Sequence, residues 1–154
     1  MEEELKKLNQ ITCFFKRINT KVNLLRLIEC AKKEYDKYNY EEAKKHLEDG
    51  YNIDNNNDAV LRGLGCIEQF SGNYERAIEY FTQALNSSKA KEVEYTLIGM
   101  AYYLQDKLDE AVEYFNLAID INDDYPSAYN GRNQAMLENH VKIIDLQETL
   151  KKYF

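Results

Sequence analysis

Apolar residues recur every three or four positions along most of the chain, which is the spacing of a helix buried on one face. Short polar joints such as DKYN, SGN and QDK interrupt this pattern, and their Asp and Asn residues favour turns and helix starts. The pattern predicts an all-α chain. The expected helical segments are 3–19, 24–37, 38–51, 58–71, 72–85, 92–105, 106–119, 126–138 and 141–154.

Part of this pattern repeats at a fixed interval. Ala43, Ala77 and Ala111 lie 34 residues apart, twice. A large apolar residue follows each alanine by four positions, as Leu47, Phe81 and Phe115. A period of this length is typical of stacked helical repeats, each of which buries its apolar face against its neighbours.

Small residues also recur in the helix that precedes each of these segments, as Ala31, Gly65 and Gly99. Glycine inside a helix costs about 1 kcal/mol relative to alanine. Its recurrence therefore predicts that two helices approach closely at this position, leaving no room for a larger side chain.

Taken together, these residues resemble the tetratricopeptide repeat family. The second copy carries the resemblance through Leu61, Leu64, Gly65, Gly72, Tyr74, Ala77, Phe81 and Ala84. The third does so through Tyr95, Ile98, Gly99, Tyr102, Ala111, Phe115 and Ala118, and the weaker first copy through Leu27, Ala31, Tyr40, Ala43 and Leu47. The proline that often closes the repeat is missing, although Pro126 follows the third copy. The resemblance implies a right-handed α-solenoid of stacked antiparallel helix pairs.

We expect a single domain over residues 1–154. Its expected parts are an N-terminal helix at 1–21, repeats at 24–57, 58–91 and 92–125, and a degenerate fourth pair at 126–154 whose second helix caps the last repeat. The N-terminal helix has a stripe formed by Leu5, Leu8, Ile11, Phe15 and Ile18. Since such a helix is marginal alone, we expect it to dock on the end of the solenoid, in its groove, or on another chain.

Composition narrows the class of partner. The chain has 154 residues, one Pro, six Gly and a net charge of −7, which favours a helical protein that does not bind nucleic acid. No apolar run reaches the ~20 residues of a membrane span and no signal peptide precedes the repeats, so we expect a cytoplasmic protein that does not bind membranes. Three cysteines and two histidines lie far apart, so no metal or cofactor is expected.

In the resembled family, the first helix of each pair lines a concave face. Helical geometry then nominates the residues that alternate with the packing positions. These candidate binding residues are Ile28, Lys32, Tyr35, Arg62, Cys66, Gln69, Phe70, Val93, Leu97, Met100, Tyr103, Leu104, Asn130 and Gln134.

The segment VEYTLIGMAYYL in the third repeat is apolar nearly all round. One face of it packs in the solenoid, and the other would lie exposed in the groove, as binding surfaces do. Alternatively, one of the chain's own terminal helices covers that second face. The sequence leaves both interpretations open.

No Gly-rich phosphate loop, His-based metal motif or nucleophile elbow is present, so we do not expect an enzyme. We expect a scaffold or adaptor that binds an apolar or basic peptide or helix of a partner protein. One alternative is a small acidic chaperone for secreted or assembly-prone partners, including a form that is a homodimer through its N-terminal helix. The other is a regulatory subunit of a larger enzyme or signalling complex.

Some members of the family clamp the C-terminal carboxylate of heat-shock chaperones with Lys, Asn and Arg. The equivalent positions here are Ile28, Lys32, Gly63, Val93 and Leu97. Because only Lys32 carries a positive charge, we expect no such clamp.

Overall fold

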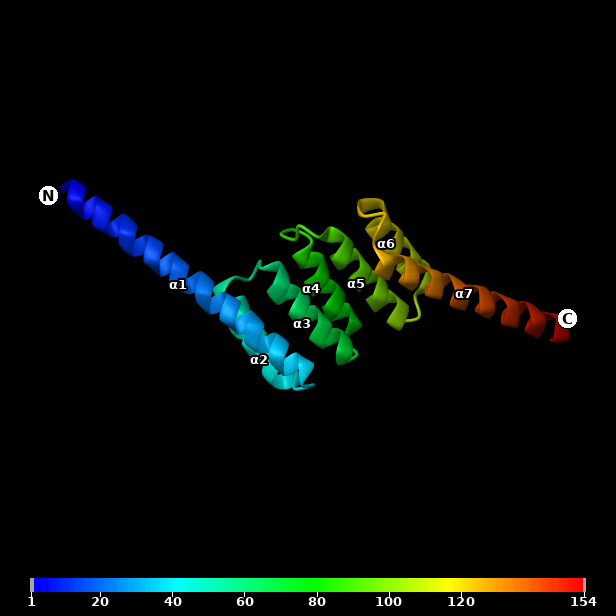
Figure 1. Cartoon of the computed structure of the whole chain (residues 1–154). Helices are drawn as coiled ribbons and strands as arrows, with labels where there is room; N and C mark the ends of the chain where they lie inside the picture. The colour runs from blue at the N-terminus through cyan, green and yellow to red at the C-terminus, as the bar shows by residue number, and fades with distance from the viewer. Residues whose placement is uncertain (1, 154) are drawn as a thin grey trace.

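The computed structural model describes the backbone of residues 2–153 and the side chains of residues 4–149. Within these residues the chain forms α-helices joined by short turns, and no strand. The helices are α1 (Glu2–Asp36), α2 (Tyr40–Ile53), α3 (Asp58–Phe70), α4 (Tyr74–Ala84), α5 (Lys91–Leu104), α6 (Leu108–Ile121) and α7 (Pro126–Tyr153). Helices that follow one another pack side by side, so that α1 with α2, α3 with α4 and α5 with α6 form three stacked pairs (Figure 1). The predicted all-α solenoid of helix pairs is confirmed.

The 34-residue period extends to the backbone of the turn inside each pair. Tyr38, Gly72 and Asp106 occupy the same place in the three repeats and have positive φ angles of 65°, 78° and 65°. The amide after each of them donates to the carbonyl five residues earlier, at 2.9, 2.9 and 3.0 Å. Two of these three positions accept a left-handed conformation without glycine, which costs roughly 1–2 kcal/mol for a residue with a Cβ. The same turn backbone therefore joins the two helices of every pair.

The residues of the repeat pattern form the core. The three repeat alanines are fully buried, as are Phe81 and Phe115 at 0% and 1% exposure. A Cβ added at Gly65 would lie 2.4 Å from Phe81 Cε1, and one added at Gly99 would lie 3.0 Å from the ring of Phe115. The close helix approach predicted from these glycines is confirmed.

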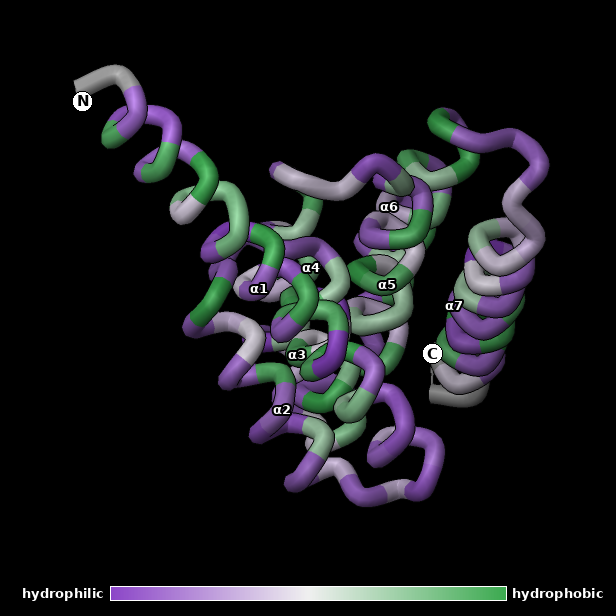
Figure 2. Tube along the Cα trace, turned by 60° about the vertical axis from the view of Figure 1, so that its left-hand side comes forward, coloured by the Kyte–Doolittle hydropathy of each residue, from purple (hydrophilic) through white to green (hydrophobic). Residues whose placement is uncertain are grey.

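The N-terminal helix does not form a separate element. Residues 2–21 are the first part of the single helix α1, which continues into the first repeat without a break. Every described side chain from Glu4 to Asn23 is exposed, so the expectation that this segment docks within the chain is wrong. The segment from 19 to 24 contains neither Gly nor Pro, so nothing local stops the helix. This part of α1 projects away from the stacked pairs (Figure 1) and alternates between hydrophobic and hydrophilic segments along its trace (Figure 2).

The fourth pair also differs from the prediction. The segments expected as two helices, 126–138 and 141–154, form one helix over the described residues, α7, because the joint LENHV contains neither Gly nor Pro and its single Asn does not stop the helix. The side chains of residues 141–149 are exposed. They therefore do not fold back as a cap on the last repeat. The rest of the expected cap, from residue 150 on, has side chains outside the described residues. The helix α7 packs mainly on α6 and also on α5, and Lys142 pairs with Asp106 of the turn between these two helices.

Candidate functional site

A cleft of about 440 Å³ lies between α1 and α3. It is lined by Ile28, Ala31, Lys32, Tyr35, Leu47, Ala59, Arg62, Gly63 and Cys66. Five of these are candidate binding residues, so the structure brings together side chains that lie up to 38 positions apart in the chain. Sites for small ligands have volumes of roughly 300–1,000 Å³ and are lined mostly by apolar groups, which is the character of this cleft.

The absence of a side chain at Gly63 keeps this cleft open. A Cβ added at Gly63 would lie 2.9 Å from both methyl carbons of Leu47, which is 5% exposed in the core below. The close fit of Leu47 against the bare backbone of α3 leaves the space above Gly63 open. Any larger residue at this position would push against Leu47 and enter the cleft.

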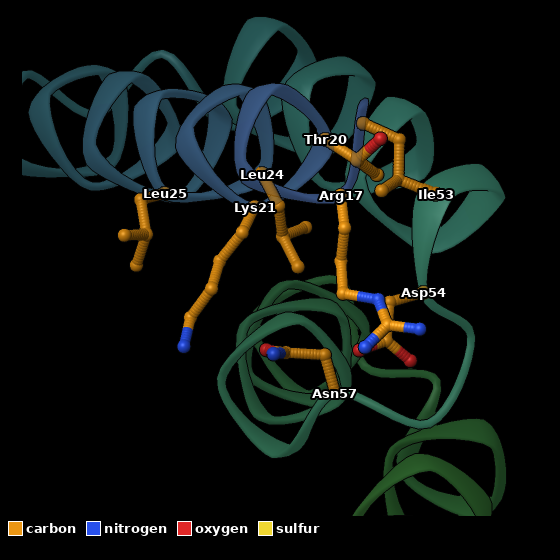
Figure 3. Close-up of a pocket in the computed structure, with 8 residues that line it drawn as sticks. All are labelled: Arg17, Thr20, Lys21, Leu24, Leu25, Ile53, Asp54 and Asn57. Carbon is orange, nitrogen blue, oxygen red and sulfur yellow. The ribbon is translucent and has the colours of Figure 1, made fainter. Parts of the chain in front are cut away.

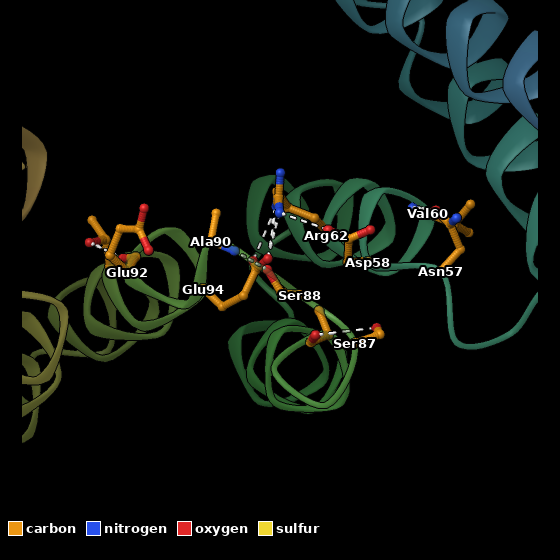
Figure 4. Close-up of polar contacts among 11 residues, drawn as sticks. Asn57, Asp58, Val60, Arg62, Ser87, Ser88, Ala90, Glu92 and Glu94 are labelled. Atoms are coloured by element: carbon orange, nitrogen blue, oxygen red, sulfur yellow. Dashed lines mark hydrogen bonds and ion pairs between the residues drawn. The ribbon is translucent and has the colours of Figure 1, made fainter. Parts of the chain in front are cut away.

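The cation on the α3 side of the cleft is already paired. Arg62 Nη2 donates to Glu94 Oε1 at 2.6 Å and Arg62 Nε lies 3.1 Å from both carboxylate oxygens, while Asp58 is a longer contact at 3.5 Å (Figure 4). Glu94 on α5 is 0% exposed. The hydrogen bond to Glu94 raises the pKa of Arg62 above its ordinary value. The pair therefore links α3 to α5 and neutralises the guanidinium.

Two further groups define the chemistry of the cleft. Lys32 is exposed and makes no ion pair with the described residues, so it supplies the available positive charge. Burial raises the pKa of the Cys66 thiol to about 11, which keeps the thiol protonated and a poor nucleophile at neutral pH. The cleft can thus hold apolar side chains, with one cation at its rim.

An aromatic cluster adjoins this cleft through Tyr35, which lines it. The ring of Phe70 stacks on Tyr40 at 5.2 Å and meets Tyr35 edge to face at 5.7 Å, yet Phe70 is 63% exposed. On the same helix, Gln69 Oε1 is buried without a hydrogen-bond partner among the described residues. The exposed ring of Phe70 can receive an apolar side chain of a bound segment.

The candidate residues on α5 form a second group, apart from the cleft between α1 and α3. Val93 and Leu97 are half-buried, whereas Met100 and Leu104 are 39% and 44% exposed. The described parts of α1 and α7 leave Met100 and Leu104 exposed. The interpretation in which a terminal helix covers this face is therefore not the one that the described residues adopt.

At the α7 side, Tyr103 joins the candidate residues to the last helix. Its hydroxyl donates to Glu138 Oε2 at 2.7 Å and accepts from Gln134 Nε2 at 3.1 Å. The hydrogen bond to Glu138 raises the pKa of Tyr103. Asn130, one turn before Gln134, is exposed. These side chains give this end of the face a polar border.

The sequence pattern did not predict two buried acids, because the carboxylates follow the spacing of solvated helix surfaces. Glu94 is one, and Glu68 at 1% exposure is the other. Glu68 accepts hydrogen bonds from Lys44 at 2.9 Å and from Asn73 at 2.8 Å. The repeat does indicate that Glu94 is buried, because the equivalent residue of the preceding repeat, Val60, is a core residue.

A second cleft, of about 410 Å³, lies between α1 and the joint that follows α2. The Arg17 side chain reaches from α1 toward Asp54 across it, whereas the Lys21 side chain extends beside Leu25 and away from Asp54 (Figure 3). Arg17 therefore faces an acidic side chain of the same chain. This surface was not predicted as a site.

Neither a metal centre nor a membrane span is found in the part of the chain that the structure describes. No group of three or more His, Cys, Asp or Glu side chains is placed to hold a metal ion there. No described helix is both long and apolar enough to cross a bilayer.

The stacked pairs, their shared turn and the face formed by the first helix of each pair define the class of α-solenoid repeat proteins. Two family models, both described as tetratricopeptide repeat, match residues 63–91 and 93–125. Residues 63–125 therefore match the tetratricopeptide repeat over almost their whole length, and the chain is similar to the proteins of that family.

One curated relative is human RNA polymerase II-associated protein 3, which is 28% identical over 106 residues. This match covers 69% of the chain but 15% of the relative, so the chain spans a small part of the relative's length.

Two similar solved structures are complexes with peptides. The first TPR of Spaghetti (RPAP3) bound to the HSP90 peptide SRMEEVD has a TM-score of 0.70 and 18% identity, and the match covers 77% of this chain and 94% of that one. The Yersinia enterocolitica type III secretion chaperone SycD in complex with a peptide of the translocator YopD has a TM-score of 0.67 and 20% identity, covering 75% and 94%. At these identities the similarity shows the fold.

Proposed function

We propose that the chain is a non-catalytic adaptor whose concave face binds an extended or helical segment of a partner protein. The observation that supports this most strongly is the open cleft between α1 and α3, together with the exposed apolar side chains on α5. The fold is typically that of a peptide-binding interaction module, and both solved complexes named above hold peptides. We place its action in the cytoplasm.

The bound segment is proposed to be apolar or basic. The chain has a net charge of −7, and Arg62 is neutralised by Glu94, which leaves Lys32 as the cation available at the cleft. The HSP90 peptide of the related complex carries three acidic side chains and a terminal carboxylate. One lysine would not compensate the cost of desolvating these groups, so we propose that this chain does not bind such a tail.

A chaperone for secreted or assembly-prone partners is a second candidate. The likeness to the SycD complex supports it, since that protein is named as a secretion chaperone and holds a peptide of its translocator. Both candidates use the same face. They differ in whether the client is kept from assembling, which a client aggregation assay would distinguish.

Peptide selection on the immobilised full chain tests the proposal. We expect selected peptides to be rich in apolar and basic residues, and SRMEEVD to show no saturable binding at concentrations where they saturate. Ile28→Glu in the cleft and Met100→Glu on α5 should each weaken binding by at least about tenfold, because each buries a charge against an apolar ligand. Ile121→Glu is the matched control, since Ile121 is 50% exposed on α6 and is not a candidate binding residue.

Circular dichroism of each variant separates lost binding from lost folding. A selected set dominated by acidic peptides, or peptides that bind Ile28→Glu and Met100→Glu as tightly as the control, would contradict the proposed groove.

A further inference from the structure

The projecting part of α1 carries an apolar stripe that packs on nothing in the described chain. The stripe consists of Leu8, Ile11, Phe15, Ile18, Val22 and Leu25, which are between 41% and 61% exposed. They alternate at spacings of three and four residues without exception. This is the a/d pattern of a coiled coil sustained over nearly three heptads, and we call these six residues the α1 seam.

Over most of its length the α1 seam faces away from the solenoid, and only Leu25 at its end borders the cleft between α1 and the joint that follows α2. In the second half of α1, Leu24, Leu27 and Ala31 are buried against α2 and the first core cluster. At 100° per residue, the mean direction of the seam lies roughly half a turn around the helix from these three residues. Another helix can therefore lie along the seam without displacing any part of the stacked pairs.

We infer that the α1 seam pairs antiparallel with the α1 seam of a second copy of this chain. The seam is complementary to itself in that orientation, because every a position then meets a d position of the other copy. The layers are Leu8 with Leu25, Ile11 with Val22 and Phe15 with Ile18, each formed twice by the two-fold symmetry. Pairing would bury side chains that otherwise leave a long exposed helix marginally stable.

Charge beside the seam selects the antiparallel orientation. Lys21 and Arg26 occupy the flanking g and e positions, and a parallel pair would bring Lys21 of each copy against Arg26 of the other. In the antiparallel pair, Lys21 lies beside Phe14 and Arg26 beside Leu5 of the other copy. Glu4 and Glu29 occupy the next seam positions at either end and stop the apolar layers there in both orientations.

An anionic bilayer is the competing occupant, because residues 5–28 contain six basic residues and no acidic one. The spacing of the seam residues favours a second copy of the chain as the occupant. A helix lying on a bilayer needs a broad apolar face, whereas here Thr12, Asn19 and Arg26 run along one edge of the seam and narrow it to a strip. This inference is independent of the proposed peptide groove.

Sedimentation equilibrium of the full chain tests the inference. We expect a dimer at micromolar concentration, and Ile11→Glu or Ile18→Glu should raise its dissociation constant by roughly a hundredfold or more, since symmetry places each charge in two apolar layers. Gln10→Glu and Asn23→Glu are controls of equal charge on the same helix at positions outside the seam, and both should remain dimeric. A monomeric wild type, or a dimer that both seam variants leave intact, would overturn the inference.

The orientation is tested by cross-linking in a chain whose Cys13 is replaced by serine. Leu8→Cys and Leu25→Cys chains, tagged differently and mixed under mild oxidation, should form a disulfide between the two kinds of chain. Each variant alone should not cross-link. Cross-linking of Leu8→Cys with itself would overturn the antiparallel arrangement. Binding of the monomer to vesicles of anionic lipid, with loss of binding in Ile11→Glu, would show the bilayer to be the occupant instead.

Discussion

Replacing Arg62 by methionine tests whether the buried pair between α3 and α5 stabilises the solenoid. The substitution keeps most of the side-chain volume but removes every hydrogen bond to Glu94, including the 2.6 Å contact from Nη2. Glu94 is 0% exposed, so its carboxylate would be left buried without a partner. Removing one member of a buried pair costs about 3–5 kcal/mol.

The lower end of this range applies here, because the Arg62 side chain is 31% exposed and water can approach the site. We therefore expect a loss of about 3 kcal/mol, or a fall of roughly 6–12 °C in Tm for a chain of this length. Urea unfolding followed by circular dichroism at 222 nm measures it. The double variant Arg62→Met/Glu94→Leu should recover most of the loss, since exchanging a whole buried pair for apolar groups is often neutral.

Arg76→Met is the matched control. Arg76 Nη1 lies 3.6 Å from the other buried acid, Glu68, but the Arg76 side chain is 58% exposed and Lys44 and Asn73 still hold the carboxylate. We expect a change below about 0.5 kcal/mol. If Arg62→Met loses as little free energy of unfolding as this control, the pair does not link the repeats as described. The same holds if the double variant is no more stable than Arg62→Met.

Three smaller predictions concern other parts of the molecule. Gly65→Ala should lower the free energy of unfolding by about 1–3 kcal/mol, measured in urea, because its Cβ would lie 2.4 Å from buried Phe81; an unchanged value would disprove the close approach. Burial alone would raise the pKa of Glu68, but its hydrogen bonds outweigh burial and hold the pKa below the ordinary value. The ionised Glu68 carboxylate therefore stabilises the fold at pH values above the ordinary pKa, and this stabilisation is lost as the pH falls through the lowered pKa. Glu68→Gln should make the free energy of unfolding depend less on pH in the acid range. Exposed Cys13 should react with Ellman's reagent well before Cys66, whose pKa is about 11; equal rates would show Cys66 to be accessible.

The repeat explains why most of the fold could be predicted from the sequence. A residue such as Ala77 or Phe81 recurs because each pair must bury the same face against the next pair, so the packing constraint is repeated along the chain and visible in it. The ends of the chain have no such constraint. Where the repeat stopped at residues 24 and 138, we expected helix boundaries, but a helix ends only at a breaker or a turn, and neither is present there.

Part of the candidate site could be predicted in the same way, since helical geometry alone places Ile28, Lys32 and Tyr35 on one face of α1. The pairing of Arg62 with Glu94 could not, because it depends on the distance between two helices whose sequences lie 32 residues apart. The only signal in the sequence is that Glu94 is charged where the second and fourth copies have Val60 and Ala128. The exposure of Met100 depends likewise on where the terminal helices lie, which the pattern left open.

Chemical-shift mapping of the ¹⁵N-labelled full chain with a selected apolar or basic peptide tests the central claim most directly. The proposed function predicts that the largest changes follow the first helix of each pair, along residues 28–35, 59–70 and 93–104, while amides of α2, α4 and α6 change little. Changes concentrated on those second helices, or on the projecting parts of α1 and α7, would show that the partner binds elsewhere.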